Sequence, residues 1–193
     1  MMNLLALILT GLFWLLFLGR TAMLMRRGVQ VFVLGKGKGW KQKLVEWALT
    51  PLMVLWSVEI LMTALGNPLF PLALMGSVPE LRGVGLGLCV AGLMLFVWAL
   101  VSFGGAWRVG IDERHSDRLI TGGAFGFSRN PIFLFMDMYM LGIFLICPTL
   151  FFLLVFVGGA VLIHMQILNE ERFLQGKFGG EYADYRRRVR RYL

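Results

Sequence analysis

Cysteine, histidine and charge are all scarce in this chain of 193 residues. There are two cysteines, Cys89 and Cys147, and two histidines, His115 and His164. Two thiols are too few for a disulfide framework, and two imidazoles do not complete a metal site with them. We therefore expect no bound metal and assign the cysteines no role. The chain also lacks an internal repeat and a long linker, which indicates one compact bundle.

Apolar residues dominate instead, at 58% of the chain with a mean hydropathy of +0.74. This exceeds what a soluble domain of this size needs for its core, so we expect an integral membrane protein. Charged residues are bunched, and the stretches between them predict an all-α bundle of about five transmembrane helices. These stretches are 4–18, 47–65, 84–103, 131–146 and 149–164. Pro148 separates the last two and predicts a tight hairpin between them.

The distribution of cations predicts the orientation of the helices. Lysine and arginine gather in 20–43, in 108–129 and from Arg172 onward, whereas the 66–82 loop has only Arg82. This alternation places the N-terminus outside and the C-terminus in the cytoplasm. The first apolar stretch has no basic residue before it, which favours a retained helix over a removed signal peptide. The net charge of +8 needs no nucleic acid, because a basic tail suits anionic lipid headgroups.

A glycine-rich segment precedes the fourth apolar stretch. Gly122, Gly123 and Gly126 allow the backbone to approach a ligand closely. Asn130 is suited to cap a helix that begins at Pro131, and such a helix start favours an anion. The simpler interpretation is that the glycines turn the chain and Asn-Pro begins a membrane helix.

A second polar segment follows the last apolar stretch. Asn169 is suited to cap a new helix, with Glu170 and Glu171 in its first turn. Beyond it, aromatic and apolar residues recur at spacings of three and four, which predicts an amphipathic C-terminal helix with arginines on its other face. Gly179-Gly180 lowers helix propensity and predicts a bend. The amphipathic face consists of Phe178, Tyr182, Tyr185, Val189 and Tyr192.

In order, these segments resemble the isoprenylcysteine carboxyl methyltransferase and phospholipid methyltransferase superfamily of membrane enzymes, including bacterial members with Arg-Asn-Pro in place of Arg-His-Pro. The resemblance covers roughly 105–192. It implies N-terminal transmembrane helices in 1–103 and a catalytic core in 104–193, comprising a cytoplasmic loop, the hairpin 131–164 and the C-terminal helix. The matching stretches are Leu119-Ile-Thr-Gly-Gly-Ala-Phe125, Arg129-Asn-Pro-Ile-Phe133, Gln166 with Glu170-Glu171, and Phe178-Gly-Gly-Glu-Tyr-Ala-Asp-Tyr185.

The resemblance also implies S-adenosylmethionine as the methyl donor, held on the cytoplasmic side, with an acceptor that arrives from the bilayer. We expect a bacterial inner membrane location. The cofactor-binding residues carried over from the family are Asp117, Arg118, Leu119, Ile120, Phe125, Asn130, Pro131, Ile132, Phe133, Glu170 and Glu171. The catalytic candidates are Asn130, Gln166 and Asp137.

The departures from the family pattern cluster on the acceptor side. Asn130 stands where the family has His, Phe133 where it has Tyr, and Gln166 where it has an Arg that faces an acceptor carboxylate. Glutamine cannot offer a charged bidentate fork. A lipophilic acceptor without a carboxylate, or a small thiol or amine, therefore fits at least as well as a carboxyl acceptor.

Three ionisable residues lie within or at the ends of the apolar stretches. Asp137 lies about two turns into its helix and is suited to orient an acceptor or take its proton; the alternative is an ion pair with Arg129 or another interfacial cation. For Glu59 we expect a structural hydrogen bond between helices. His164 is more often a packed interfacial histidine than a base, although it is close to the second polar segment.

Two other functions remain open at this point. Membrane sterol reductases share an Asn-Pro-x-Tyr style of helix start and use NADPH. A non-catalytic membrane module whose basic tail binds anionic lipid is the other alternative, because three family side chains are replaced. Competition between the two cofactors separates the enzymes, and steep salt dependence with no cofactor effect indicates the lipid-binding module.

Overall fold

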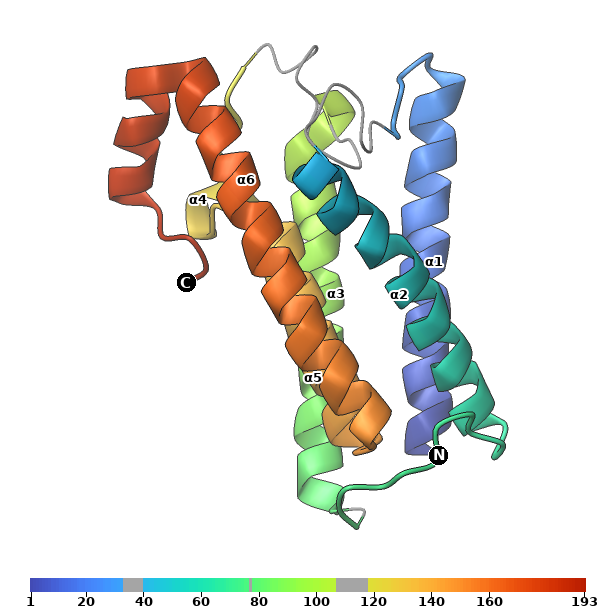
Figure 1. Ribbon diagram of the computed structural model, residues 1–193. Helices are drawn as coiled ribbons and strands as arrows, with labels where there is room; N and C mark the ends of the chain where they lie inside the picture. The colour runs from blue at the N-terminus through green and yellow to red at the C-terminus, as the bar shows by residue number, and fades with distance from the viewer. Residues whose placement is uncertain (33–39, 77, 107–117) are drawn as a thin grey trace.

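The computed structural model describes residues 1–32, 40–76, 78–106 and 118–193, and the described chain forms a bundle of long helices (Figure 1). Four helices are long and apolar enough to cross a membrane, and α5 is a shorter apolar helix. The expected integral membrane bundle is therefore confirmed. The elements are α1 (Met2–Arg26), α2 (Trp40–Ala64), α3 (Pro79–Phe103), the 3₁₀ turn η1 (Gly104–Ala106), α4 (Ala124–Phe127), α5 (Pro131–Ile146) and α6 (Leu150–Arg188).

The centre of the bundle is the packing of α3 on α5, which depends on small residues. A Cβ atom on Gly142 would lie 2.6 Å from both the Cys89 Sγ and the Gly85 carbonyl oxygen. Such close approach of backbones is how membrane helices associate where lipid supplies no hydrophobic driving force. Cys89 is fully buried at this contact, in agreement with a packing role. α3 therefore packs closely along one side of α5.

A short turn joins α5 to α6, as Pro148 predicted. α5 ends at Ile146 and α6 begins at Leu150, where the Thr149 hydroxyl accepts a hydrogen bond from the Phe152 amide. Because the turn is short, the two helices run antiparallel side by side (Figure 1). The start of α5 therefore lies beside the later part of α6.

The predicted helix start at Asn169 is wrong, because α6 continues through this residue to Arg188. The Asn169 side chain accepts a hydrogen bond from Arg172, one turn later in the same helix. The predicted bend is confirmed at Gly179, whose φ of 50° and ψ of −116° interrupt the helix. After this bend the chain doubles back along α6 toward α4 (Figure 1). We call residues 180–193 the tail. The division of the chain into 1–103 and 104–193 stays a prediction.

Glu59 lies near the end of α2 and is fully buried. Its carboxylate accepts hydrogen bonds from the backbone amides of Leu69 and Phe70, at 3.0 and 3.1 Å. The expected bond to another helix is therefore corrected to bonds with the loop that follows α2. The loop returns over the end of α2, so its backbone amides satisfy the Glu59 carboxylate without a partner on another helix.

Candidate active site

The start of α5 is the first component of the site. Asn130 immediately precedes the helix and Pro131 is its first residue, as predicted. The Asn130 side chain makes no capping bond; its Nδ2 donates to the Arg191 carbonyl oxygen at 3.1 Å. The Ser128 hydroxyl accepts from the Asn130 amide at 3.1 Å and lies 3.2 Å from the same Arg191 oxygen. The side chains of Asn130 and Ser128 therefore bond to the backbone of the tail, although the sequence alone would predict that Asn130 caps the helix.

The glycine-rich segment supplies an aromatic wall beside this helix start. Gly123 has a φ of +60°, which an L side chain rarely adopts, and α4 begins directly after it. This turn buries Phe125 edge-on against Phe103, with ring centroids 4.6 Å apart. The Phe125 carbonyl oxygen accepts a 2.7 Å hydrogen bond from the Tyr185 hydroxyl. The segment and the tail are thus joined on the same side of the bundle.

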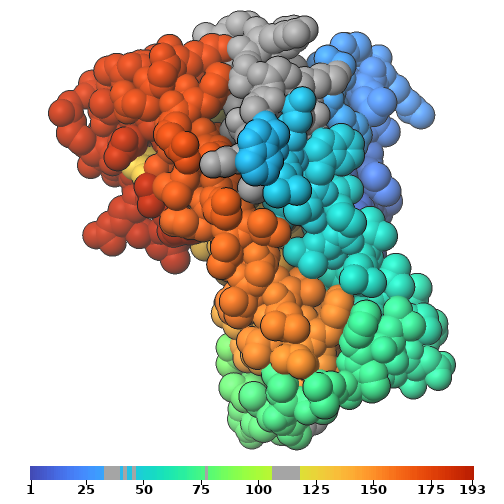
Figure 2. All heavy atoms as spheres, in the orientation of Figure 1, coloured from blue at the N-terminus to red at the C-terminus, as the bar shows by residue number. Residues whose placement is uncertain are grey.

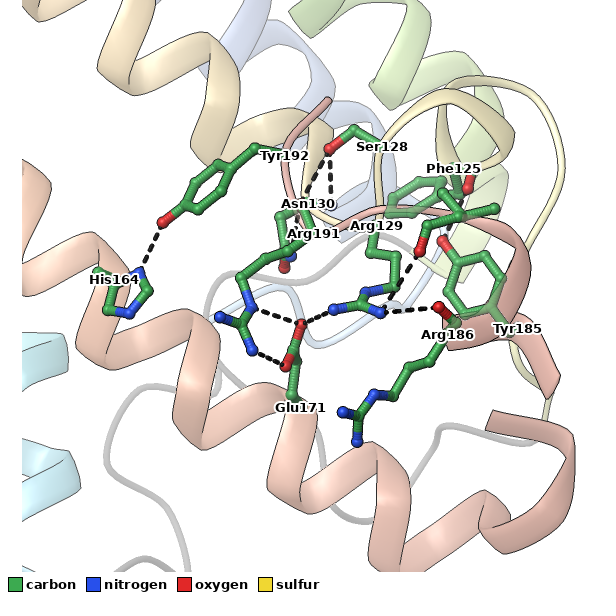
Figure 3. Close-up of polar contacts among 11 residues, drawn as sticks. Phe125, Ser128, Arg129, Asn130, His164, Glu171, Tyr185, Arg186, Arg191 and Tyr192 are labelled. Atoms are coloured by element: carbon green, nitrogen blue, oxygen red, sulfur yellow. Dashed lines mark hydrogen bonds and ion pairs between the residues drawn. The ribbon is translucent and has the colours of Figure 1, made fainter. Parts of the chain in front are cut away.

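An ion-pair cluster joins the two polar segments (Figure 3). Glu171 lies 2.7 Å from an Arg129 nitrogen and accepts two bonds from Arg191, at 3.1 and 2.8 Å. The side chains of Glu171 and Arg129 are 8% and 9% exposed, so this charge pair is largely removed from water. Residues that are 42 positions apart in the chain are therefore in direct contact.

Electrostatics of the cluster favour the ionised carboxylate. Burial raises the pKa of Glu171, but hydrogen bonds and charge from Arg191 and Arg129 outweigh it, and the net pKa is lowered. The hydrogen bond to Glu171 in turn raises the pKa of Arg191. Burial raises the pKa of Tyr182 to about 12, so this neighbouring phenol stays neutral. The cluster is stable in its charged form at neutral pH.

Of the other predicted cofactor residues, Ile132 and Phe133 lie in the first turn of α5. Glu170 is half-buried beside Glu171, and Arg118 is exposed. Asp117 lies outside the described residues. Gln166 is buried in α6, at 4% exposure, between the levels of His164 and Glu170. The half-buried apolar members of the predicted set are Leu119, Ile120, Ile132 and Phe133.

Asp137 differs from Glu171 in its surroundings. Its Oδ1 atom is buried and has no hydrogen-bond partner among the described residues. The alternative of an ion pair between Asp137 and Arg129 is wrong, because Arg129 pairs with Glu171 instead. None of the ion pairs among the described residues includes Asp137. A carboxylate within an apolar helix is costly to leave uncompensated and points to function.

Sequence reasoning missed two residues of the site, Arg191 and Tyr192, whereas it did note Ser128 as a polar side chain of the glycine-rich segment. Arg191 was grouped with the basic tail, and Tyr192 with an amphipathic face. In the structure the Tyr192 hydroxyl lies 2.8 Å from His164 Nδ1 (Figure 3). Only the recurrence of aromatic residues along the tail hinted at such a contact. The tail covers the site, and little of the segment that follows residue 117 is visible between it and α6 (Figure 2).

An all-helical membrane bundle that gathers charged residues at the start of one short helix defines a class of membrane-embedded protein. Residues 81–181, just over half of the chain, match the phospholipid methyltransferase family. The chain belongs to this family. The match spans α3, the glycine-rich segment, the hairpin and α6 past its bend. No curated protein and no solved structure matches the chain.

Family membership confirms the resemblance drawn from the two polar segments. It supports a membrane methyltransferase in general. The isoprenylcysteine carboxyl methyltransferase subtype, the cofactor and the acceptor belong to the proposal that follows.

Proposed function

We propose that this protein is an S-adenosylmethionine-dependent methyltransferase that transfers a methyl group directly, in line, to a lipophilic acceptor. Its site would face the cytoplasm from a bacterial inner membrane, in agreement with the distribution of cations. The observation that carries the proposal is the Arg129–Glu171 ion pair, which joins both family segments at the start of α5. A single small molecule at this position would be within reach of both segments.

The chemistry of the residues fits the cofactor. The first turn of a 16-residue helix leaves backbone N–H groups available for a carboxylate. Arg129 adds positive charge there, and its Nε is buried with no partner among the described residues. Glu170 is suited to an ammonium group or ribose hydroxyls, and Phe125 to the adenine ring. These groups can bind the two ends of an amino-acid nucleoside.

The protein needs little covalent chemistry for this reaction. When bound, S-adenosylmethionine supplies a methyl group that its sulfonium already makes electrophilic. The residues of the chain align the acceptor, exclude water and stabilise its nucleophilic form. The tail suits the second task, because it closes over the helix start through Asn130 and Ser128.

An amine is the acceptor that the polar groups favour. Gln166 replaces the family arginine and offers no charge to a carboxylate. Asp137 would attract a protonated amine and accept the proton that its nitrogen must lose. The nitrogen lone pair then forms the new bond to the methyl carbon, while the electron pair of the broken carbon–sulfur bond stays on sulfur. The phospholipid acceptor in the family's description agrees with an amphiphilic amine.

Calorimetric titration of the purified protein with S-adenosylmethionine tests the proposal. We expect saturable binding that Glu170→Ala weakens about tenfold, the loss of one charge-assisted hydrogen bond. Glu181→Ala, an exposed carboxylate beyond the bend, is the matched control and should bind as the wild type does. Absence of saturable binding, or equal affinity of both variants, would contradict the proposal. Thermal stabilisation by NADPH instead would support a reductase.

The tail adds a second interaction that we propose. Four arginines lie exposed there at the end of α6: Arg186, Arg187, Arg188 and Arg190. Each would contribute roughly 1 kcal/mol near an anionic surface. Binding to phosphatidylglycerol vesicles should fall steeply with salt, whereas binding to phosphatidylcholine vesicles should not.

A further inference from the structure

The antiparallel packing of α5 on α6 places Asp137 and His164 at the same level along the two helices. Arg129 pairs with Glu171 near the start of α5, and two to three turns later a Cβ on Gly159 would lie 2.7 Å from Met140 Sδ. These two contacts bracket Asp137 on α5 and His164 on α6 at the same register. The seven residues from Glu171 to His164 correspond to about 10 Å along a helix. A second polar level therefore lies two turns deeper than the ion-pair cluster.

Tyr192 reaches this level from the tail. Its hydroxyl lies 2.8 Å from His164 Nδ1, and the two rings are nearly parallel, with centroids 6.2 Å apart. The backbone before it is held at the start of α5, where the Arg129 amide donates to the Arg190 carbonyl at 3.0 Å. Burial and then the Asp137 carboxylate raise the pKa of Tyr192, which agrees with their proximity. The phenol is thus held between the ion-pair cluster and the apolar interior.

An apolar cavity adjoins the same level. It is partly open, and its roughly 430 Å³ of space not filled by atoms includes open solvent. Met136 and Ile163, the residues directly before Asp137 and His164, both line it. Trp56 closes another side, and its indole nitrogen is buried without a partner among the described residues. The apolar part of an amphiphile can therefore contact this lining while its polar head lies beside Asp137.

We propose that His164 and Tyr192 are positioning residues for the acceptor, which the C-terminal tail thus helps to hold. This inference rests on the proposed function. The Tyr192 hydroxyl holds the His164 imidazole opposite Asp137, and together they orient the acceptor amine toward the start of α5. The acceptor site is complete only when the tail is docked. Cofactor affinity depends instead on the ion-pair cluster, on Phe125 and on Glu170, and not on the contact between Tyr192 and His164.

Binding measurements on the full chain in nanodiscs, with dodecylamine as probe and dodecanol as the matched neutral amphiphile, test this inference without turnover. With S-adenosylmethionine present, we expect dodecylamine to bind at least tenfold more tightly than dodecanol. Tyr192→Phe and His164→Gln should each weaken dodecylamine about fivefold, the loss of one hydrogen bond. The double variant should equal either single variant, because both remove the same bond.

The cofactor affinity of these variants separates positioning from simple anchoring of the tail. We expect it to stay within twofold of the wild type in Tyr192→Phe and His164→Gln. Tyr185→Phe, which frees the tail from the Phe125 carbonyl, should weaken the cofactor and serves as the contrasting variant. Unchanged dodecylamine binding in Tyr192→Phe, additive losses in the double variant, or equal losses for probe and cofactor would overturn the inference. Wild-type protein that binds no S-adenosylmethionine would instead overturn the proposed function, and the inference with it.

Discussion

Glu171 and Asp137 are two carboxylates on neighbouring helices, and they differ in the charged groups that surround them. Glu171 lies at the end of the bundle between two guanidinium groups. Asp137 lies about two turns deeper, and none of the ion pairs among the described residues includes it. A buried charge is tolerated for stability only when it is compensated. Glu171 thus joins the tail to the start of α5 through its ion pairs, and the surroundings of Asp137 agree with the acceptor role proposed for it.

Glu171→Ala should have the largest effect, because it leaves Arg129 and Arg191 facing each other without an anion. Breaking a buried pair costs about 3 kcal/mol, and we expect the tail to detach from the start of α5. Hydrogen exchange of residues 186–193 and chemical unfolding measure this. Glu181→Ala should change the free energy of unfolding by less than about 0.5 kcal/mol. Equal exchange protection in the wild type and Glu171→Ala would show that the cluster does not hold the tail.

Asp137→Asn should lower activity without lowering stability, unlike Glu171→Ala. Loss of a proton acceptor lowers the rate of methyl transfer about 100-fold, while removal of an uncompensated charge leaves the protein as stable or about 1 kcal/mol more stable. Transfer of labelled methyl to phosphatidylethanolamine and thermal unfolding measure the two quantities. Asp184→Asn, an exposed carboxylate, should change neither. A stability loss as large as that of Glu171→Ala would remove the distinction between the two carboxylates.

Glu59→Gln sharpens the comparison with a third buried carboxylate, one compensated by backbone amides. An amide side chain accepts the bonds from Leu69 and Phe70 less well, so the free energy of unfolding should fall by about 1–2 kcal/mol. Cofactor affinity should be unchanged, because Glu59 bonds to the loop that follows α2, and the end of α2 lies at the opposite end of the bundle from α4 (Figure 1). Glu80→Gln at the exposed start of α3 is the control. Weaker cofactor binding in Glu59→Gln would mean that the two ends of the bundle are coupled.

Acid should loosen the tail by a smaller and reversible amount. The pKa of Glu171 lies below its ordinary value of 4.5 in the folded protein. Its contribution to stability is therefore fully present above that value and is lost as the pH falls through the lower, folded-state pKa. Exchange protection of residues 186–193 should be constant from neutral pH to about 5 and decrease below 4.5. In Glu171→Gln this decrease should be absent, and its persistence would assign the acid sensitivity to another group.

Local features predicted much of the architecture. The apolar stretches, the turn at Pro148 and the helix start at Asn130-Pro131 all agree with the structure, because each depends on residues near one another in the chain. The predicted start at Asn169 failed because capping preference is weak where an apolar helix is already propagating. The bend came ten residues later, at Gly179, where positive φ is allowed.

The residues of the site also fall into two groups: those that short segments predicted, and those that only the tertiary structure brings together. Segments and their order were enough to place the chain in its family and to nominate Asn130, Glu170-Glu171 and Asp137 as functional residues. The fold of the tail decides which carboxylate pairs with the arginines, because Arg191 reaches Glu171 only through the reversal at Gly179. The contact between Tyr192 and His164 likewise joins residues 28 positions apart. Composition and short motifs encode where helices lie in a bilayer, whereas charge compensation depends on distances that exist only once those helices have packed.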